Sequence, residues 1–320
     1  MNRKQSICAV LAVLVAAGAG WLYAQDDAAA GGKVLLQLRL KAGQVHNLQM
    51  TTNQKISQEI MGQKQDVTQE FGLGYSMEVL KVADNGNATV KLTYNSARMK
   101  QETPAGKTEY DSARKDASVP PAARPFAALL GQSLQLEMTP QGNIVKVEGV
   151  DKLIDALLKA IELPAGADKS VLEKAFREQF GDEAVKENMT QMFAAYPKTA
   201  VGVGESWSKT ATMTKPFPLK TESTWTLKSL KGAVAVLDIQ SKLRANPEGP
   251  PMKMGPMTIR PDLSGQQSGT QDVDTATGWL KSCKLTQEFS GKLKMEGAPG
   301  MTQPMEWPIT VKGTVTIESR

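Results

Sequence analysis

Methionine is the residue type whose spacing most directly suggests chemistry in this sequence. Met252, Met254 and Met257 lie in the segment Pro-Pro-Met-Lys-Met-Gly-Pro-Met, and Met301 and Met305 follow in a second Pro- and Gly-rich segment. Thioether sulfurs are soft ligands that select Cu(I), and this spacing could place several around one ion. Methionine-rich loops also form adaptable apolar surfaces. No histidine or cysteine lies nearby, so Met252, Met254 and Met257 are candidate metal ligands beside two plainer alternatives, an apolar contact surface and loop packing.

Residues suited to catalysis are few. His46 is the only histidine, and most zinc sites and Ser-His-Asp triads need one. It falls in register with Leu48 and Met50 on an expected strand, which favours a half-buried structural role. Ser112 and Lys115 match a Ser-x-x-Lys pattern, but its companion motifs are missing, and no glycine-rich phosphate-binding motif occurs. We therefore predict a non-enzymatic protein with no catalytic residue and no cofactor.

The N-terminal residues carry an export signal. Arg3 and Lys4 precede an apolar run from Ile7 to Leu22, and Ala24 supplies a small residue at the cleavage position. These features predict a secretory signal peptide over residues 1–24, with Ala30 as a second possible exit and residues 25–32 as a flexible N-terminus. The predicted location is the periplasm or the cell exterior, with no stable membrane span after cleavage.

Cleavage would leave one cysteine and a mild charge. Cys283 alone cannot form an internal disulfide, and we interpret it as a small apolar strand residue rather than a reactive thiol. The chain has 38 Lys and Arg residues against 33 Asp and Glu residues. Without Arg3 and Lys4 the difference is 36 − 33, or +3. Such a weak, dispersed charge excludes nucleic acid as a partner, and leaves a lipid or an envelope protein.

Two β-rich segments flank a helical middle. Residues 33–148 and 200–320 show the period-two alternation of strands with one wet face, starting with Leu36, Leu38 and Leu40. Turn signals at Asp84–Asn87 and Pro140–Asn143 predict hairpins. Residues 149–199 instead carry three apolar stripes at helical spacing. Long connections are expected over 246–269 and 296–304. The helical stripes are Leu153–Ile161, Val171–Phe180 and Val185–Tyr196. The alternating strand segments are Val67–Val79, Val90–Tyr94, Leu134–Met138 and Val311–Ile317.

These elements predict an α+β fold that is mainly β. We expect a long curved antiparallel sheet with the helical insert covering its concave face. Two duplicated half-sheets are one way to build this sheet. The N-terminal β half, the insert and the C-terminal β half would occupy residues 33–148, 149–199 and 200–320.

The hairpin over Leu134–Gly149 carries a resemblance. It combines a strand, a Pro-x-Gly-x turn at Pro140–Asn143 and a second strand, with helices following, and it resembles the hallmark of a family of exported bacterial proteins of unknown function. The segment Leu40–His46 is similar too, although an aromatic residue is more usual where His46 stands. The resemblance implies no activity and no catalytic residue. More loosely, the order of sheet and helix is similar to periplasmic lipoprotein-carrier folds, but fold does not fix function.

The apolar faces of strands and helices give the functional hypothesis. We predict an exported binding protein whose ligand is hydrophobic, such as a lipid acyl chain. Two alternatives stand beside it. One is a structural or interaction protein of the cell envelope that docks through its Met- and Pro-rich loops. The other is a Cu(I)-binding periplasmic protein that uses Met252, Met254 and Met257.

Overall fold

A computed structural model gives the structure of the protein. It describes residues 32–60, 62–114, 118–161, 170, 173, 174, 177, 181–192, 196–214, 218–254, 257–297, 301 and 303–320. The predicted signal peptide lies outside the described residues, as do most of the helical stripe expected over Val171–Phe180 and Lys115 of the Ser-x-x-Lys pattern.

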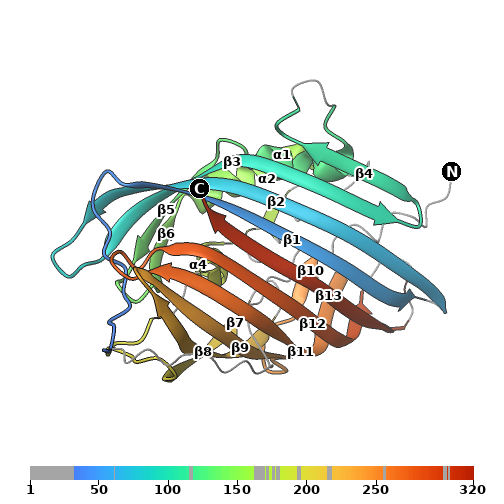
Figure 1. Cartoon of the computed structure of the whole chain (residues 1–320). Helices are drawn as coiled ribbons and strands as arrows, with labels where there is room; N and C mark the ends of the chain where they lie inside the picture. The colour runs from blue at the N-terminus through green and yellow to red at the C-terminus, as the bar shows by residue number, and fades with distance from the viewer. Residues whose placement is uncertain are drawn as a thin grey trace.

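One antiparallel sheet of thirteen strands dominates the described part of the chain (Figure 1). Its order is β6-β5-β3-β2-β1-β13-β12-β11-β9-β8-β7, with β4 paired to β3 and β10 to β11. Because β1 pairs with both β2 and β13, the N-terminal and C-terminal β segments form one continuous sheet. The predicted long curved antiparallel sheet is therefore confirmed. The strands are β1 (Val45–Ile60), β2 (Gln63–Val82), β3 (Ala88–Thr103), β4 (Gly106–Asp111), β5 (Ser133–Met138), β6 (Ile144–Glu148), β7 (Ser206–Met213), β8 (Leu219–Lys231), β9 (Val234–Ala245), β10 (Met252–Met254), β11 (Met257–Asp274), β12 (Leu280–Glu296) and β13 (Met305–Ser319).

The hairpin turns lie where turn-forming residues predicted them. β2 and β3 are joined by residues 83–87, in which Gly86 has φ +82°, a conformation that favours glycine. The turn between β5 and β6 contains Pro140–Asn143, with Gly142 at φ +81°. Local turn chemistry therefore fixes the register of these hairpins.

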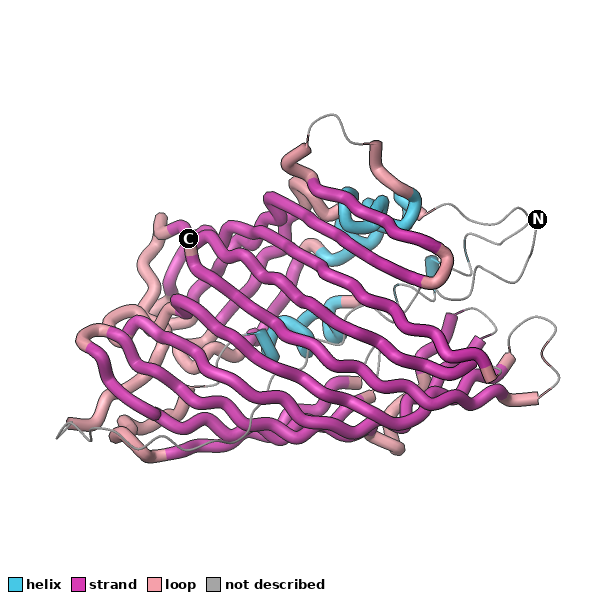
Figure 2. Tube along the Cα trace, turned by 45° about the vertical axis from the view of Figure 1, so that its right-hand side comes forward, coloured by secondary structure: helices cyan, strands magenta, loops and turns pink. Residues whose placement is uncertain are grey.

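Helices lie on the inner side of the curled sheet (Figures 1 and 2). They are η1 (Pro121–Ala123), α1 (Arg124–Ala128), α2 (Val150–Ala160) and α4 (Asp182–Met192). Helix α4 packs against both β6 and β7, the opposite ends of the strand order. The sheet must therefore curl until its two edges approach the same helix. The predicted cover by the helical insert is confirmed for this part of the concave face.

The spacing of apolar residues explains how α2 docks. Val150, Leu153, Ile154 and Leu158 form one stripe and are all buried. They join the cluster that also holds Leu237 of β9. Helix α1 covers a different part of the sheet, where Phe126 stacks on Phe71 of β2 with ring centroids 4.9 Å apart.

The segment before β1 differs from the prediction. Leu36, Leu38 and Leu40 are buried as the alternation implied, but the segment is not a strand. Its backbone bonds go to different turns, with the Leu38 amide donating to Pro140 O and the Arg39 amide to Thr277 O. Period-two burial thus arises here from an extended segment that crosses other elements instead of pairing along one strand.

The prediction of a long connection over residues 246–269 is also wrong, because Met257–Asp274 form β11. The glycine and proline residues of this segment are typical of loops, so the sequence did not indicate a strand. Pro261 lies between the stretch paired with β10, which ends at Ile259, and the stretch paired with β9, which begins at Ser264. A residue without an amide hydrogen is tolerated at such a gap.

Candidate functional site

The concave face carries three bands that cross the strands. Along β12, Cys283 and Leu285 belong to one apolar cluster, Phe289 and Leu293 belong to another, and Gln287 lies between them. All five have odd numbers, so they face the same side of the sheet. The same sequence of apolar, polar or glycine, and apolar positions recurs on β13, β9 and β8. The concave face is therefore banded and not uniformly apolar.

The first apolar band includes helices. Its buried members come from strands, from the segment before β1, from α2 and from the loop positions Tyr196, Val201 and Trp279. Val185 and Met189 of α4 pack against it. We call it the helix-covered cluster.

The second apolar band lies at the other end of the strands. All of its buried members come from strands, and no described helix contributes to it. We call it the strand-only cluster. It contains Ile56, Val67, Met213, Leu219, Leu243, Met252, Leu263, Phe289, Leu293, Met295, Trp307, Ile309 and Val311.

Polar residues in direct register separate these clusters, and we call them the polar row. Each member is the cross-strand partner of the next, so the row runs along the hydrogen-bonding direction of the sheet. It consists of Gln69, Gln54, Gly313, Gln287, Gln267, Ser241, Ser223 and Lys209, from β2, β1, β13, β12, β11, β9, β8 and β7.

Members of the polar row bond to one another, but one buried acceptor of the row has no partner. The Gln69 amide donates to Gln54 Oε1 at 3.0 Å, and the Gln267 amide donates to Gln287 Oε1 at 2.8 Å. Gln267 is only 1% exposed, yet its own Oε1 has no partner. Thr52, two residues before Gln54 on β1, is also 1% exposed, and its Oγ1 has no partner either. Such an orphaned group costs about 1–3 kcal/mol. The polar row therefore destabilises the folded state relative to apolar side chains at the same positions.

The row ends at a lysine that joins the two edges of the sheet. Lys209 Nζ donates to Asn143 Oδ1 in the β5–β6 turn at 2.6 Å. Lys209 is half-buried, and this desolvation lowers the pKa of its ammonium group below the ordinary value.

Methionines gather in the strand-only cluster. Met252 is buried there, and Met257, Met301 and Met305 pack against it. Met295 of β12 also belongs to this cluster and is the register partner of Met305 across the β12–β13 hairpin. The structure thus places Met252 and Met257 of the candidate metal ligands in one cluster. The backbone of Met254 pairs with Met257, and its side chain lies outside the described set.

His46 lies on β1 and stacks on Trp279, with ring centroids 3.9 Å apart and the planes at 19°. His46 Nε2 and Trp279 Nε1 are both buried without a hydrogen-bond partner. Burial lowers the pKa of the imidazole below its ordinary value of 6.5. The stacking and burial of His46 agree with the interpretation of this residue as a structural one.

We predict that folding becomes less favourable as the pH falls below the ordinary histidine pKa. The folded state holds His46 with a lowered pKa, so the unfolded state takes up the proton first and protonation favours unfolding. Because His46 is the only histidine, its imidazole NMR signals can be followed without assignment. The midpoint should lie below 6.5, and a midpoint at or above 6.5 would contradict the burial argument. His46→Phe should flatten the pH dependence of stability in this range.

The lone cysteine is part of the core. Cys283 is buried in β12 within the helix-covered cluster, and burial raises the pKa of its thiol to about 12. A thiol that stays protonated is a poor nucleophile. The interpretation as an apolar strand residue therefore agrees with the structure.

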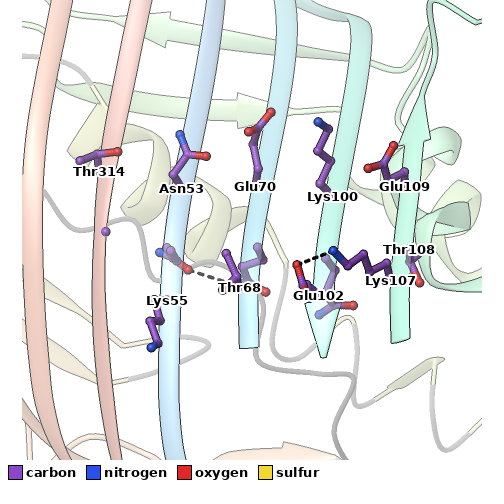
Figure 3. A pocket seen from close by; sticks show the side chains of 14 residues that line it. Asn53, Lys55, Thr68, Glu70, Lys100, Glu102, Lys107, Thr108, Glu109 and Thr314 are labelled. Atoms are coloured by element: carbon purple, nitrogen blue, oxygen red, sulfur yellow. Dashed lines mark hydrogen bonds and ion pairs between the residues drawn. The ribbon is translucent and has the colours of Figure 1, made fainter. Parts of the chain in front are cut away.

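A hollow of about 490 Å³ lies over β1–β4 and β13. Figure 3 shows one row of its lining, in which Asn53, Glu70, Lys100 and Glu109 come from four neighbouring strands. These side chains alternate with the inward-facing positions, so they belong to the outer face of the sheet.

The charges of this hollow balance. It is lined by Lys55, Lys100 and Lys107 and by three glutamates, and Lys107 forms an ion pair with Glu102 at 3.2 Å. Exposed pairs of this kind contribute little energy. Its lining holds neither histidine nor cysteine. We therefore interpret the hollow as a surface of charged side chains that pair across strands.

None of the helices among the described residues combines the length and apolar character needed to cross a membrane. No group of three or more His, Cys, Asp or Glu side chains in the described part of the chain could hold a metal ion.

These features define a class: a one-sheet protein, curled around helices, with a banded inner face. A family model described as a family of unknown function, DUF6263, matches residues 85–280. Because this match covers more than half of the chain, the protein belongs to that family. The predicted membership of a family of unknown function is thereby confirmed. No curated protein matches the sequence.

Solved structures give distant likenesses. A structure described as lipid–protein interactions in lipovitellin has a TM-score of 0.49 and 6% identity, covering 88% of this chain and 25% of that chain. The present chain thus spans about a quarter of that one. The COG4313 outer membrane channel from Pseudomonas putida F1 has a TM-score of 0.26 and 7% identity, covering 88% and 97% of the two chains. Likenesses at these values support no inference about ligand or activity.

Sequence reasoning did not find the polar row. Its glutamines and serines read singly as ordinary strand residues, and only the cross-strand register brings them together. One signal was available: in β12, Gln287 interrupts an apolar face that resumes at Phe289.

Proposed function

We propose that the protein is an exported binding protein that holds a long-chain amphiphile on the concave face of its sheet. The observation that carries this proposal is the polar row, which crosses the apolar interior in register and includes the buried, unsatisfied acceptor Gln267 Oε1. A molecule with an alkyl chain and a polar group matches these bands, because its alkyl chain would contact the apolar strand-only cluster and its polar group would contact the polar row.

The dimensions of the strand-only cluster suit an alkyl chain. On β12 its members extend from Phe289 to Met295, which is six residues, or about 20 Å at the usual rise of a strand. One lipid chain fills about half of the ~30 Å hydrocarbon core of a bilayer. The strand-only cluster is therefore long enough for one such chain lying along the strands.

Access to the interior is best placed at the methionine-rich end. Met257, Met301 and Met305 are only partly buried there, and methionine side chains repack easily around varied apolar shapes. A chain could enter at this end and lie along β12 and β13 until its polar group reached the polar row.

Lipid binding can be tested on protein purified from the cell envelope. Organic extraction and mass spectrometry should recover amphiphiles from the folded protein and not from a matched unrelated exported protein. After extraction, the refolded protein should take up a fluorescent fatty acid saturably. Absence of both a co-purified amphiphile and saturable uptake would overturn the proposal.

Export itself is tested by the N-terminus of the mature protein. Sequencing of the envelope-fractionated chain should begin at Gln25, directly after Ala24. An intact N-terminal methionine on a cytoplasmic protein would overturn this part of the proposal.

Soft-metal binding is a second candidate, favoured by the gathering of Met252, Met257, Met295 and Met305 near one end of the sheet. Several thioethers can hold Cu(I). Titration with Cu(I) should then be saturable and should disappear in the Met252→Leu, Met257→Leu double variant. Equal binding by this variant would exclude the site.

A further inference from the structure

We propose that Lys209 binds the headgroup of the ligand and selects an anionic amphiphile over a neutral one. This inference rests on the proposed function and names the chemical class of its ligand: a single alkyl chain that ends in a carboxylate or a phosphate.

Lys209 is positioned to face the bound molecule. Along β7, Trp207 packs against the helix-covered cluster and Met213 belongs to the strand-only cluster, and Lys209 lies between them on the same side. Its cross-strand partner is Ser223 of the polar row. A headgroup at Lys209 would therefore lie at the polar band while its chain contacts the strand-only cluster.

Among the described residues, Lys209 also has no counter-ion, unlike several lysines of the outer face. Lys292 pairs with Glu306 and Lys312 pairs with Glu288 across neighbouring strands. No carboxylate among the described residues lies within ion-pair distance of Lys209, whose hydrogen bond goes to the neutral amide of Asn143.

Two of the three carboxylates of the adjoining helix α4, Glu183 and Glu187, are already engaged. Glu187 accepts hydrogen bonds from the amide and hydroxyl of Thr214, and Glu183 pairs with Lys186. A half-buried cation with no anion nearby is destabilised by its lost hydration. An ammonium group has three donors, so Lys209 can keep its bond to Asn143 and still donate to a ligand oxygen. An anionic headgroup would supply the missing charge.

The remainder of the polar row is neutral. Its other members are amides, hydroxyls and one glycine, which repel no headgroup and attract none strongly. The preference for an anionic over a neutral amphiphile would thus depend on Lys209 alone.

The test compares Lys209→Met, which keeps an unbranched side chain of nearly the same length and removes its charge, with Lys209→Arg, which keeps the charge. Lys312→Met on the outer face is the matched control. Each extracted protein is titrated with hexadecanoate, hexadecyl phosphate and hexadecanol, and thermal unfolding confirms that each variant folds.

The wild type should bind at least one of the two anions about ten- to a hundredfold more tightly than the alcohol, as expected for a charge-assisted hydrogen bond. The stronger of the two anions identifies the headgroup. Lys209→Met should lose this preference without weaker binding of hexadecanol, whereas Lys209→Arg and Lys312→Met should retain it. Equal binding of the alcohol and both anions by the wild type, or an anion preference that survives in Lys209→Met, would overturn the inference and leave the proposed function intact. If none of the three ligands binds, the proposed function fails as well.

Discussion

Leu293→Ala is expected to lower the free energy of unfolding by about 2–5 kcal/mol, the usual cost of removing a buried leucine side chain. Leu293 is 1% exposed and belongs to the strand-only cluster. Its replacement should also weaken uptake of a fluorescent fatty acid, because the lost methyl groups would line the chain-binding surface. Chemical denaturation of the extracted protein gives the first quantity, and ligand titration under folding conditions gives the second.

Leu237→Ala is the matched control. Leu237 is 0% exposed but lies in the helix-covered cluster, so its loss of stability should be similar and its ligand affinity should be unchanged. If both variants lost the same affinity, or neither lost any, the strand-only cluster could not be the surface that holds the chain.

Gly269→Ala is expected to destabilise the sheet by at least about 1–3 kcal/mol, the range for overpacked interiors. A Cβ at position 269 would lie 1.8 Å from Lys284 O and 2.9 Å from Leu285 Cα of β12. These are backbone atoms in the central part of the sheet, so β11 and β12 would have to separate. Thermal or denaturant unfolding measures the loss.

Gly72→Ala is the comparison within the same sheet. A Cβ there would meet Arg98 Cβ at 3.4 Å and Gln49 Nε2 at 3.5 Å, which are ordinary contacts. Removal of a glycine also restricts the unfolded chain, so this variant should be neutral or more stable by up to about 1 kcal/mol. Equal behaviour of the two variants would show that β11 and β12 do not approach as closely as described.

Sequence patterns predicted the long hairpins well because their signals are local. The alternation in Val67–Val79 and the turn at Asp84–Asn87 specify β2 and β3 without knowledge of the remaining chain. β11 was missed because Pro261 and two glycines are residue types typical of loops. These residues are tolerated because of how the neighbouring strands pair with and approach β11. For Leu36–Leu40 the error is the reverse: the sequence predicted a strand, but the buried positions alternate there without a strand partner.

The candidate site was less predictable than the fold. The methionine segment was visible because Met252 and Met257 are close in sequence, but its neighbours Met295 and Met305 join it only through strand pairing. Lys209 resembled any polar strand residue. Its importance depends on facing inward at the end of the polar row, and that follows from pairings across the whole sheet.

Photolabelling is the most direct test of whether an alkyl chain lies on the concave face. Extracted protein would be loaded with a fatty acid that carries a photoreactive group near its methyl end, irradiated, and mapped by mass spectrometry. We expect labels within Phe289–Met295 and Trp307–Val311 that unlabelled hexadecanoate suppresses. Suppressible labels confined to the outer hollow around Glu70 and Lys100, or no suppressible label at all, would contradict the account.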